Sequence, residues 1–233
     1  MFPIRDHNPS TITPYVTWGL IAVNAAVFLL GNVVQPSEIA RNYFEFEWGM
    51  IPARLSYGQG WITLLSSMFL HAGWLHLGGN MLFLWIFGDN LEAAMGRLRY
   101  LVFYLTCGVI AAGSEYLAAP WANYPVIGAS GAIAGVLGGY LLLYPKARVD
   151  VLIIFVIFFR VFPIPAWIVL GLWIAMQLFS GALGQNDGVA YWEHIGGFAA
   201  GLVLCLPLWL RQRRIPPMTP SHIPTVPRND ATK

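Results

Sequence analysis

The sequence predicts an all-α membrane protein built as a six-helix bundle, and three observations support this fold class. Hydrophobic residues make up 57% of the 233 residues and charged residues only 10%, whereas about 25% of a typical soluble domain is charged. The apolar residues occur in blocks of about 20, the length of helix that crosses roughly 30 Å of hydrocarbon. The basic residues are also distributed asymmetrically between the two sides of such a bundle. The net charge of +2 is too small to indicate a nucleic-acid partner.

The first expected span follows a short polar start, residues 1–13, which contains one arginine and no convincing small-residue cleavage site. We therefore expect a retained helix instead of a signal peptide. Hydropathy and the interrupting Gly and Pro residues place the six spans at residues 15–34, 75–94, 98–119, 130–145, 166–183 and 194–210. The membrane domain then covers residues 14–211, and the proline-rich segment 212–233 is expected to be a disordered cytoplasmic tail.

Other segments are too short or too mixed to cross. Residues 35–60 form a long, aromatic-bearing connection after the first span. Residues 151–159 are apolar but would reach only about 14 Å as a helix, so we expect an interfacial or partly inserted segment. Cys107 and Cys205 are isolated within apolar blocks, and we expect them to pack in the membrane without forming a disulfide or binding a metal.

The fourth span is unusually short. Helix-permissive sequence begins near Ser130, after Gly128, and Pro145 ends it. Such a helix covers about 22 Å, which is less than the hydrocarbon thickness. If it reaches the far surface at Pro145, Ser130 lies inside the membrane, and the loop before it dips down to meet it. Non-helical backbone at that depth needs protein or water around it, so the length predicts a buried, hydrated cavity.

The positive charges give the orientation. With six spans both termini share one side, and that side holds all 13 Lys and Arg residues except Arg41 and Arg54. The positive-inside rule then places both termini on the cytoplasmic side of a prokaryotic-type cell or inner membrane. Ser130, His194 and His76 all lie toward the outer face in this topology. Polar groups at one level of a membrane indicate a functional site.

Ser130 and His194 suggest a nucleophile and its general base. A serine hydroxyl is a weak nucleophile until a base within about 3 Å takes its proton. Two pairs of glycines, each four residues apart, allow the fourth and sixth helices to approach closely. These helix-packing glycines are Gly131 and Gly135 on the fourth span, and Gly197 and Gly201 on the sixth.

A tetrahedral intermediate also needs hydrogen-bond donors for its oxyanion. The Ser130 backbone N–H lies at a helix start, where unpaired donors and the helix dipole favour negative charge. His76 and Asn80 lie on one face of the second span and can supply side-chain donors. His71 is a possible accessory residue, but its spacing from His76 is poor for a shared metal, and we expect no metal.

No carboxylate is convincingly placed to orient His194, so we expect a Ser–His dyad without an acidic third member. Three side chains of the fifth span are assigned either to the substrate route or to core and lipid contacts: Gln177, Trp173 and Phe179. Glu92 is expected to contact Arg97 or Arg99 on the cytoplasmic side.

The motif around Ser130 is not the nucleophile elbow of α/β-hydrolases, because the fifth residue is Ala132 and no βαβ pattern is present. It resembles the rhomboid family of intramembrane serine proteases. The matching motifs are His71-Ala-Gly-Trp-Leu-His76-Leu-Gly-Gly-Asn80, Gly128-Ala-Ser130-Gly131 and His194-Ile-Gly-Gly197-Phe-Ala-Ala-Gly201.

The resemblance implies a six-helix core with Ser130 as nucleophile, His194 as base, and an oxyanion hole formed by His76, Asn80 and the Ser130 N–H. It further implies single-span membrane proteins as substrates and no cofactor. The sequence departs from the family pattern at Ala134, where some members carry a tyrosine that stacks on the base. It also has Ala53 before Arg54, where some members have a Trp-Arg pair.

Two other classes of function compete with a protease. A catalytically silent relative would bind transmembrane helices without cutting them, but such relatives usually lack the serine or the histidine, and this chain has both. A small transporter is disfavoured because the sequence has no visible inverted repeat and no acidic residue convincingly at mid-membrane. The oligomeric state is left open.

Overall fold

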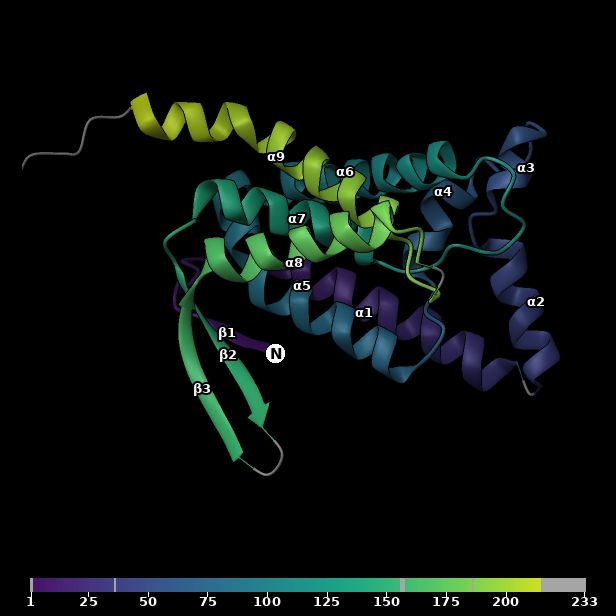
Figure 1. Cartoon of the computed structure of the whole chain (residues 1–233), viewed down its shortest axis with the longest axis horizontal. Coiled ribbons are helices and arrows are strands. Elements are labelled where there is room, and N and C mark those ends of the chain that lie inside the picture. Colours follow the sequence, from purple (N-terminus) through teal and green to yellow (C-terminus); the bar gives the residue numbers. More distant parts are fainter. Residues whose placement is uncertain (1, 36, 156–157, 186, 215–233) are drawn as a thin grey trace, which may run out of the picture.

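The computed structural model describes residues 2–35, 37–155, 158–185 and 187–214. It is mostly helical, with elongated helices side by side and a small sheet at one end of them (Figure 1). The long helices are α1 (Tyr15–Leu29), α5 (Trp74–Met95), α6 (Arg97–Ala118), α7 (Ser130–Leu143), α8 (Ala166–Ala182) and α9 (Tyr191–Arg214). Among the described residues, three helical segments are long and apolar enough to cross a membrane: Tyr15–Asn32, Arg97–Ala118 and Tyr191–Arg213.

Shorter elements connect these helices at the end of the molecule opposite the sheet (Figure 1). They are a π-helical turn after α1 (Leu30–Val34), α2 (Glu38–Trp48), α3 (Pro52–Ser56), α4 (Thr63–Ser66) and a 3₁₀ turn (Ser67–Phe69). Local sequence explains two of their starts. The Ser37 side chain accepts a hydrogen bond from the Ala40 N–H at the start of α2, and Pro52 occupies the first turn of α3, where a missing N–H costs nothing.

The expected all-α fold class was wrong in one respect, because the chain also forms a three-stranded antiparallel sheet. Its strands are β1 (Phe2–Asp6), β2 (Arg148–Phe155) and β3 (Phe158–Pro165), in the order β1-β2-β3. The segment expected to be interfacial therefore forms a hairpin, and part of the expected polar start pairs with it. β1 joins β2 through Pro3↔Val151 and Arg5↔Asp150, a pairing across more than 140 residues that local patterns do not reveal.

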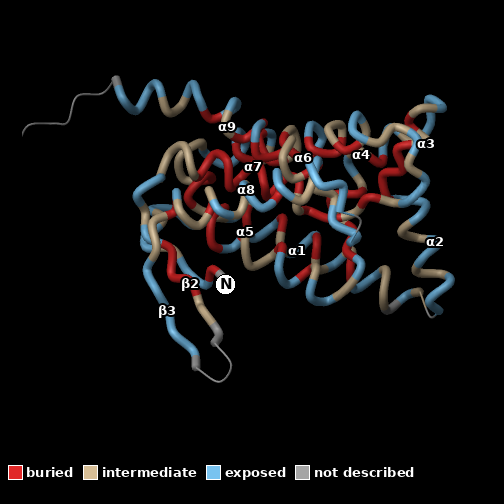
Figure 2. Tube along the Cα trace, viewed as in Figure 1, coloured by how far each residue is buried: buried red, intermediate tan, exposed pale blue. Residues whose placement is uncertain are grey.

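Helix α7 lies at the centre of the bundle. Every residue from Gly131 to Tyr140 is buried, and Figure 2 shows buried chain gathered around α7. Its 14 residues cover about 21 Å, so it is short, as its sequence predicts. It packs most extensively against α9, with α6, α5 and α8 around it.

Glu92 corrects another expectation. Its fully buried carboxylate does not pair with Arg97 or Arg99; it accepts hydrogen bonds from the Val16 N–H at 3.0 Å and the Thr17 N–H at 2.8 Å. These donors lie in the first turn of α1, where N–H groups have no partner within their own helix. A negative charge there is also favoured by the helix dipole, so Glu92 of α5 caps α1.

Helix α9 continues to Arg214, beyond the expected boundary at residue 211. The rest of the expected tail, residues 215–233, lies outside the described residues.

Candidate active site

Ser130 is the first residue of α7, and the chain before it is shaped by a glycine. Gly128 has φ +133°, a region that favours glycine, and its N–H donates to the Ser67 carbonyl oxygen at 2.9 Å. A Cβ at Gly128 would lie 2.8 Å from His76 Nε2 and 3.5 Å from Ser130 Oγ. Because Gly128 has no side chain, the loop can lie directly against His76 just before Ser130 begins the helix.

His194 lies in the second turn of α9, and its Nε2 is 2.8 Å from Ser130 Oγ. This hydrogen bond joins two helices whose backbones are nearly in contact. A Cβ on Gly197 would collide with the Gly131 carbonyl oxygen, and one on Gly201 would collide with that of Gly135. The four glycines thus lie at the α7–α9 contact that sets the serine–histidine distance.

Gln177 of α8 makes the second hydrogen bond of the histidine ring, with its Oε1 at 2.7 Å from His194 Nδ1. A carbonyl oxygen can only accept, so Nδ1 carries the proton and the Nε2 lone pair of the neutral ring faces Ser130. This tautomer is the one in which Nε2 can accept the serine proton. This partner of Gln177 is not predicted from the sequence, although an amide within an apolar span signals that a polar partner exists.

Trp173, one turn before Gln177 on α8, packs beside the base. Its ring centroid is 5.7 Å from that of His194, with 38° between the planes. It lines the same cleft as Ala134, where the resemblance described above led us to expect a stacking tyrosine in some family members. An aromatic ring from a different helix therefore contacts the imidazole in this chain.

The expected oxyanion donors come from α5 and α7. Asn80 is buried, and its Nδ2 has no hydrogen-bond partner among the described residues. His76 reaches the Gly128 loop beside Ser130. His71, in contrast, is buried behind His76 with ring centroids 5.0 Å apart, and within the described part of the chain it hydrogen-bonds neither Ser130 nor His194.

The beginning of α9 is fixed to α6 by two acidic residues. The Glu193 N–H donates to the Glu115 carboxylate at 3.1 Å, and both side chains are buried. Glu193 does not hydrogen-bond His194, although it is adjacent in sequence. The Glu115 carboxylate therefore holds the helix start that carries the base.

The long connection after α1 is held by Arg54 despite its departure from the family pattern. The guanidinium donates to the Phe46 carbonyl oxygen at 2.9 Å and lies 4.5 Å above the centre of the Phe46 ring. Hydrogen bonding and cation–π attraction act on the same residue. Arg54 thus ties α3 to α2 without a preceding tryptophan.

These groups open into one cleft of about 1100 Å³. Side chains that line it include His76, Asn80, Ser130, Trp173 and His194. Its size suits an extended stretch of polypeptide. A hydroxyl, a correctly protonated imidazole and nearby N–H donors in such a cleft can perform acyl transfer.

Comparison with known proteins shows to which family the chain is similar. A model of the Rhomboid domain matches residues 58–211. The chain is 30% identical to the mitochondrial Rhomboid protein 1 of Saccharomyces cerevisiae over 198 residues, 81% of this chain and 51% of that one. It is 31% identical to the mitochondrial Presenilin-associated rhomboid-like protein of Mus musculus over 188 residues, 79% and 46% of the two chains.

A bacterial relative is Rhomboid protease GluP of Bacillus subtilis, which is 41% identical over 81 residues, 35% of this chain and 15% of that one. The chain spans about half or less of the length of these curated relatives.

Proposed function

The chain belongs to the rhomboid family and is a multi-pass membrane protein, and from this premise we propose that it is an intramembrane serine endopeptidase. Its substrates are single-span membrane proteins, which it cleaves in or near the transmembrane segment without a cofactor. The observation that carries the proposal is the 2.8 Å hydrogen bond between Ser130 Oγ and His194 Nε2 at the wall of the cleft.

The proposed topology has six spans, α1, α5, α6, α7, α8 and α9, within a membrane domain of residues 14–211. Both termini lie on the cytoplasmic side of a prokaryotic-type cell or inner membrane. The distribution of basic residues supports this orientation, since the opposite side carries only Arg41 and Arg54. The cleft then opens toward the outer face, where water can reach it.

In the proposed reaction, Ser130 Oγ attacks the scissile carbonyl carbon while its proton passes to His194 Nε2. The negative charge on the carbonyl oxygen is stabilised by the Ser130 N–H and by the side chains of His76 and Asn80. His194 then gives the proton to the leaving amine, the C–N bond breaks, and an acyl-enzyme remains. A water molecule, deprotonated by His194, releases the second product by the same steps.

Gln177 is proposed as a positioning residue, since its carbonyl holds the Nδ1–H tautomer of His194. Trp173 restricts the ring from the side. The Ser–His dyad therefore has a neutral amide in the place that a carboxylate occupies in a soluble triad. This arrangement avoids an additional charge inside the membrane.

The test uses the full-length protein in detergent with a transmembrane substrate, followed by gel analysis of the products. Ser130→Ala and His194→Ala should each abolish cleavage while thermal unfolding stays near that of the parent. Ser10→Ala, in the loop before α1, is the matched control and should cleave normally. A fluorophosphonate probe should label the parent but not Ser130→Ala. A folded parent that neither cleaves nor labels would support the catalytically silent alternative, and normal cleavage by Ser130→Ala would refute the nucleophile.

A further inference from the structure

The β2–β3 hairpin leaves the bundle at the end opposite the Ser130–His194 cleft. β2 begins five residues after α7 ends, and β3 leads directly into α8. In Figure 1 the two strands run crosswise to the long helices and extend past the edge of the bundle beyond α1. Because the helix ends mark a membrane surface, a hairpin in this direction runs along that surface.

The sheet changes character along its length. β1 pairs with β2 only between Val149 and Leu152. In this part Val149 and Val151 are buried in the core that also contains α8 side chains. Beyond Leu152 only β2 and β3 continue, paired from Ile153↔Arg160 to Phe155↔Phe158. A two-stranded hairpin is marginally stable in water and needs a further surface to pack on.

The outer part of the hairpin exposes large apolar side chains. Phe159 is 70% exposed, Val161 45% and Phe162 38%. Trp167, in the first turn of α8, is 57% exposed and extends this apolar surface toward the lipid-facing side of the helix. Tryptophan is enriched at the boundary between lipid and water. The exposed strand β3 thus leads directly into a helix whose first turn carries an exposed tryptophan.

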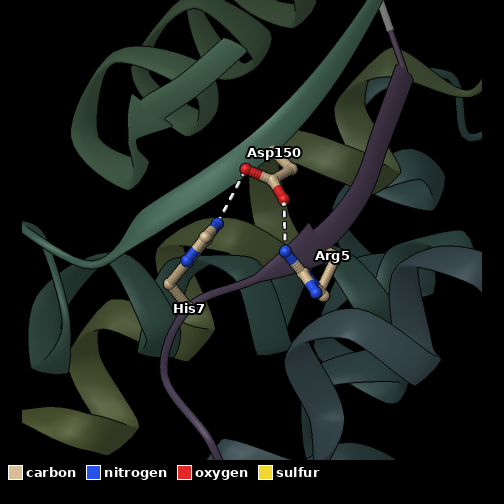
Figure 3. Close-up of polar contacts among 3 residues, drawn as sticks. All are labelled: Arg5, His7 and Asp150. Carbon is tan, nitrogen blue, oxygen red and sulfur yellow. Dashed lines mark hydrogen bonds and ion pairs between the residues drawn. The ribbon is translucent and has the colours of Figure 1, made fainter. Parts of the chain in front are cut away.

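The charges of this region are almost entirely positive. Asp150 is the only carboxylate of β2 and β3, and Figure 3 shows it held between Arg5 at 3.0 Å and His7 at 2.7 Å. Lys146, Arg148 and Arg160 are exposed. A paired carboxylate and exposed basic groups suit an anionic phospholipid surface, to which each basic residue adds attraction.

We propose that the outer part of the β2–β3 hairpin lies flat in the headgroup region of an anionic phospholipid leaflet. Phe159 and Val161 reach the upper acyl chains, and Arg160 binds lipid phosphates. The unpaired backbone groups of edge strand β3 set the depth, because hydrocarbon does not tolerate an open sheet edge but the hydrated headgroup layer does. The proposal rests on the membrane location of the chain and not on its proteolytic activity.

The test places a nitroxide label at Val161→Cys in the full-length protein, reconstituted in vesicles of phosphatidylcholine with or without phosphatidylglycerol. The native Cys107 and Cys205 are fully buried, so labelling is directed to the new thiol. Collisions with oxygen report lipid, and collisions with a nickel chelate report water. Leu172→Cys, 56% exposed on α8, is the lipid reference, and Thr11→Cys, in the exposed loop before α1, is the aqueous reference.

The label at position 161 should have an oxygen-to-nickel collision ratio above that of Thr11→Cys and approaching that of Leu172→Cys. Phosphatidylglycerol should raise the ratio further, and Arg160→Gln should remove most of that additional rise. Phe159→Ser should increase nickel access, whereas Ile39→Ser, a matched change on α2 at the far end, should not.

Nickel access equal to that of Thr11→Cys in both lipids would overturn the proposal, as would no response to Phe159→Ser. Spin–spin broadening between labels would also overturn it, since it would show β3 pairing with a second copy. Each variant is first shown to unfold in detergent at the temperature of the parent.

Discussion

Replacing Gln177 with leucine removes the acceptor of the His194 Nδ1–H and keeps a side chain of similar volume. The acceptor lies 2.7 Å from Nδ1, in a partly buried contact between α8 and α9. Without it, the neutral imidazole no longer favours the tautomer whose Nε2 lone pair faces Ser130 Oγ. Either the Nδ1–H then has no hydrogen-bond partner, or the ring carries its proton on Nε2. In the second case Nε2 cannot accept the serine proton, and His194 cannot act as the base.

The size of the effect follows from the His194 Nδ1–H donor, which loses its acceptor. Leaving such a group unsatisfied costs about 1–3 kcal/mol, and a penalty of this size in the reacting state lowers kcat roughly 5- to 150-fold. KM should change little, because Gln177 touches the base and not the scissile bond. Gln177→Glu keeps an acceptor oxygen at the same place, so it should retain much more activity than Gln177→Leu.

The assay measures initial rates on a transmembrane substrate over a range of mole fractions in mixed micelles, which separates kcat from KM. Thermal unfolding of each variant shows whether α8 still packs. If Gln177→Leu keeps kcat within twofold of the parent, the positioning role is refuted. If Gln177→Glu and Gln177→Leu are folded and equally slow, the acceptor is not what matters, and the reasoning also fails.

Three further predictions concern the oxyanion hole, the helix contact and the sheet. Asn80→Ala should lower kcat about 10²-fold with little change in KM, because one buried donor to the oxyanion is lost; the same kinetic assay measures this. Gly201→Ala should lower stability by about 1–3 kcal/mol in detergent unfolding, since its Cβ would collide with the Gly135 carbonyl oxygen. The hydrogen bonds from His7 and Arg5 hold the pKa of Asp150 below its ordinary value, so their stabilising contribution is present above about pH 4 and is lost as pH falls below it. Asp150→Asn should therefore lower the unfolding midpoint near neutral pH, and this difference should shrink in acid.

Each of these predictions has its own control. An Asn80→Ala protein that cleaves within twofold of the parent would remove Asn80 from the oxyanion hole. Gly171→Ala, at a helical glycine on α8 where an added methyl group would have no neighbour within 4 Å, should be neutral or slightly stabilising; equal losses at Gly171 and Gly201 would contradict the packing argument. A difference between Asp150→Asn and parent that persists unchanged in acid would show that ionisation of Asp150 is not involved.

The sequence predicted the helices because their ends are marked by strong local signals. The second expected span, residues 75–94, became α5 (Trp74–Met95), which Gly96 ends at a φ of +81°. The sheet was missed for two physical reasons. Residues 152–159 are apolar at every position, so the alternation that identifies a half-buried strand is absent there. The third strand, β1, is contributed by the distant N-terminal segment.

The candidate site could be predicted only as far as its residue types allow. Ser130 and His194 stand out because each adjoins glycines in an apolar stretch. The contact of Gln177 with His194 joins two helices across a loop, and Glu92 meets α1 across 75 residues or more. In both cases a polar side chain in an apolar span signalled that a partner exists. Only the packing of the helices identifies the partner.

Two different helix contacts control the two requirements of the proposed reaction. The distance between Ser130 and His194 depends on backbone contact between α7 and α9. The glycines there have no side chain that would separate the two backbones. The tautomer and tilt of the imidazole depend on α8, through Gln177 and Trp173. Since α8 has only three buried residues in its 17, changes on its inner face should affect the chemistry more than the stability. Changes at the α7–α9 glycines should affect both together, because the contact that positions the serine is also the centre of the core.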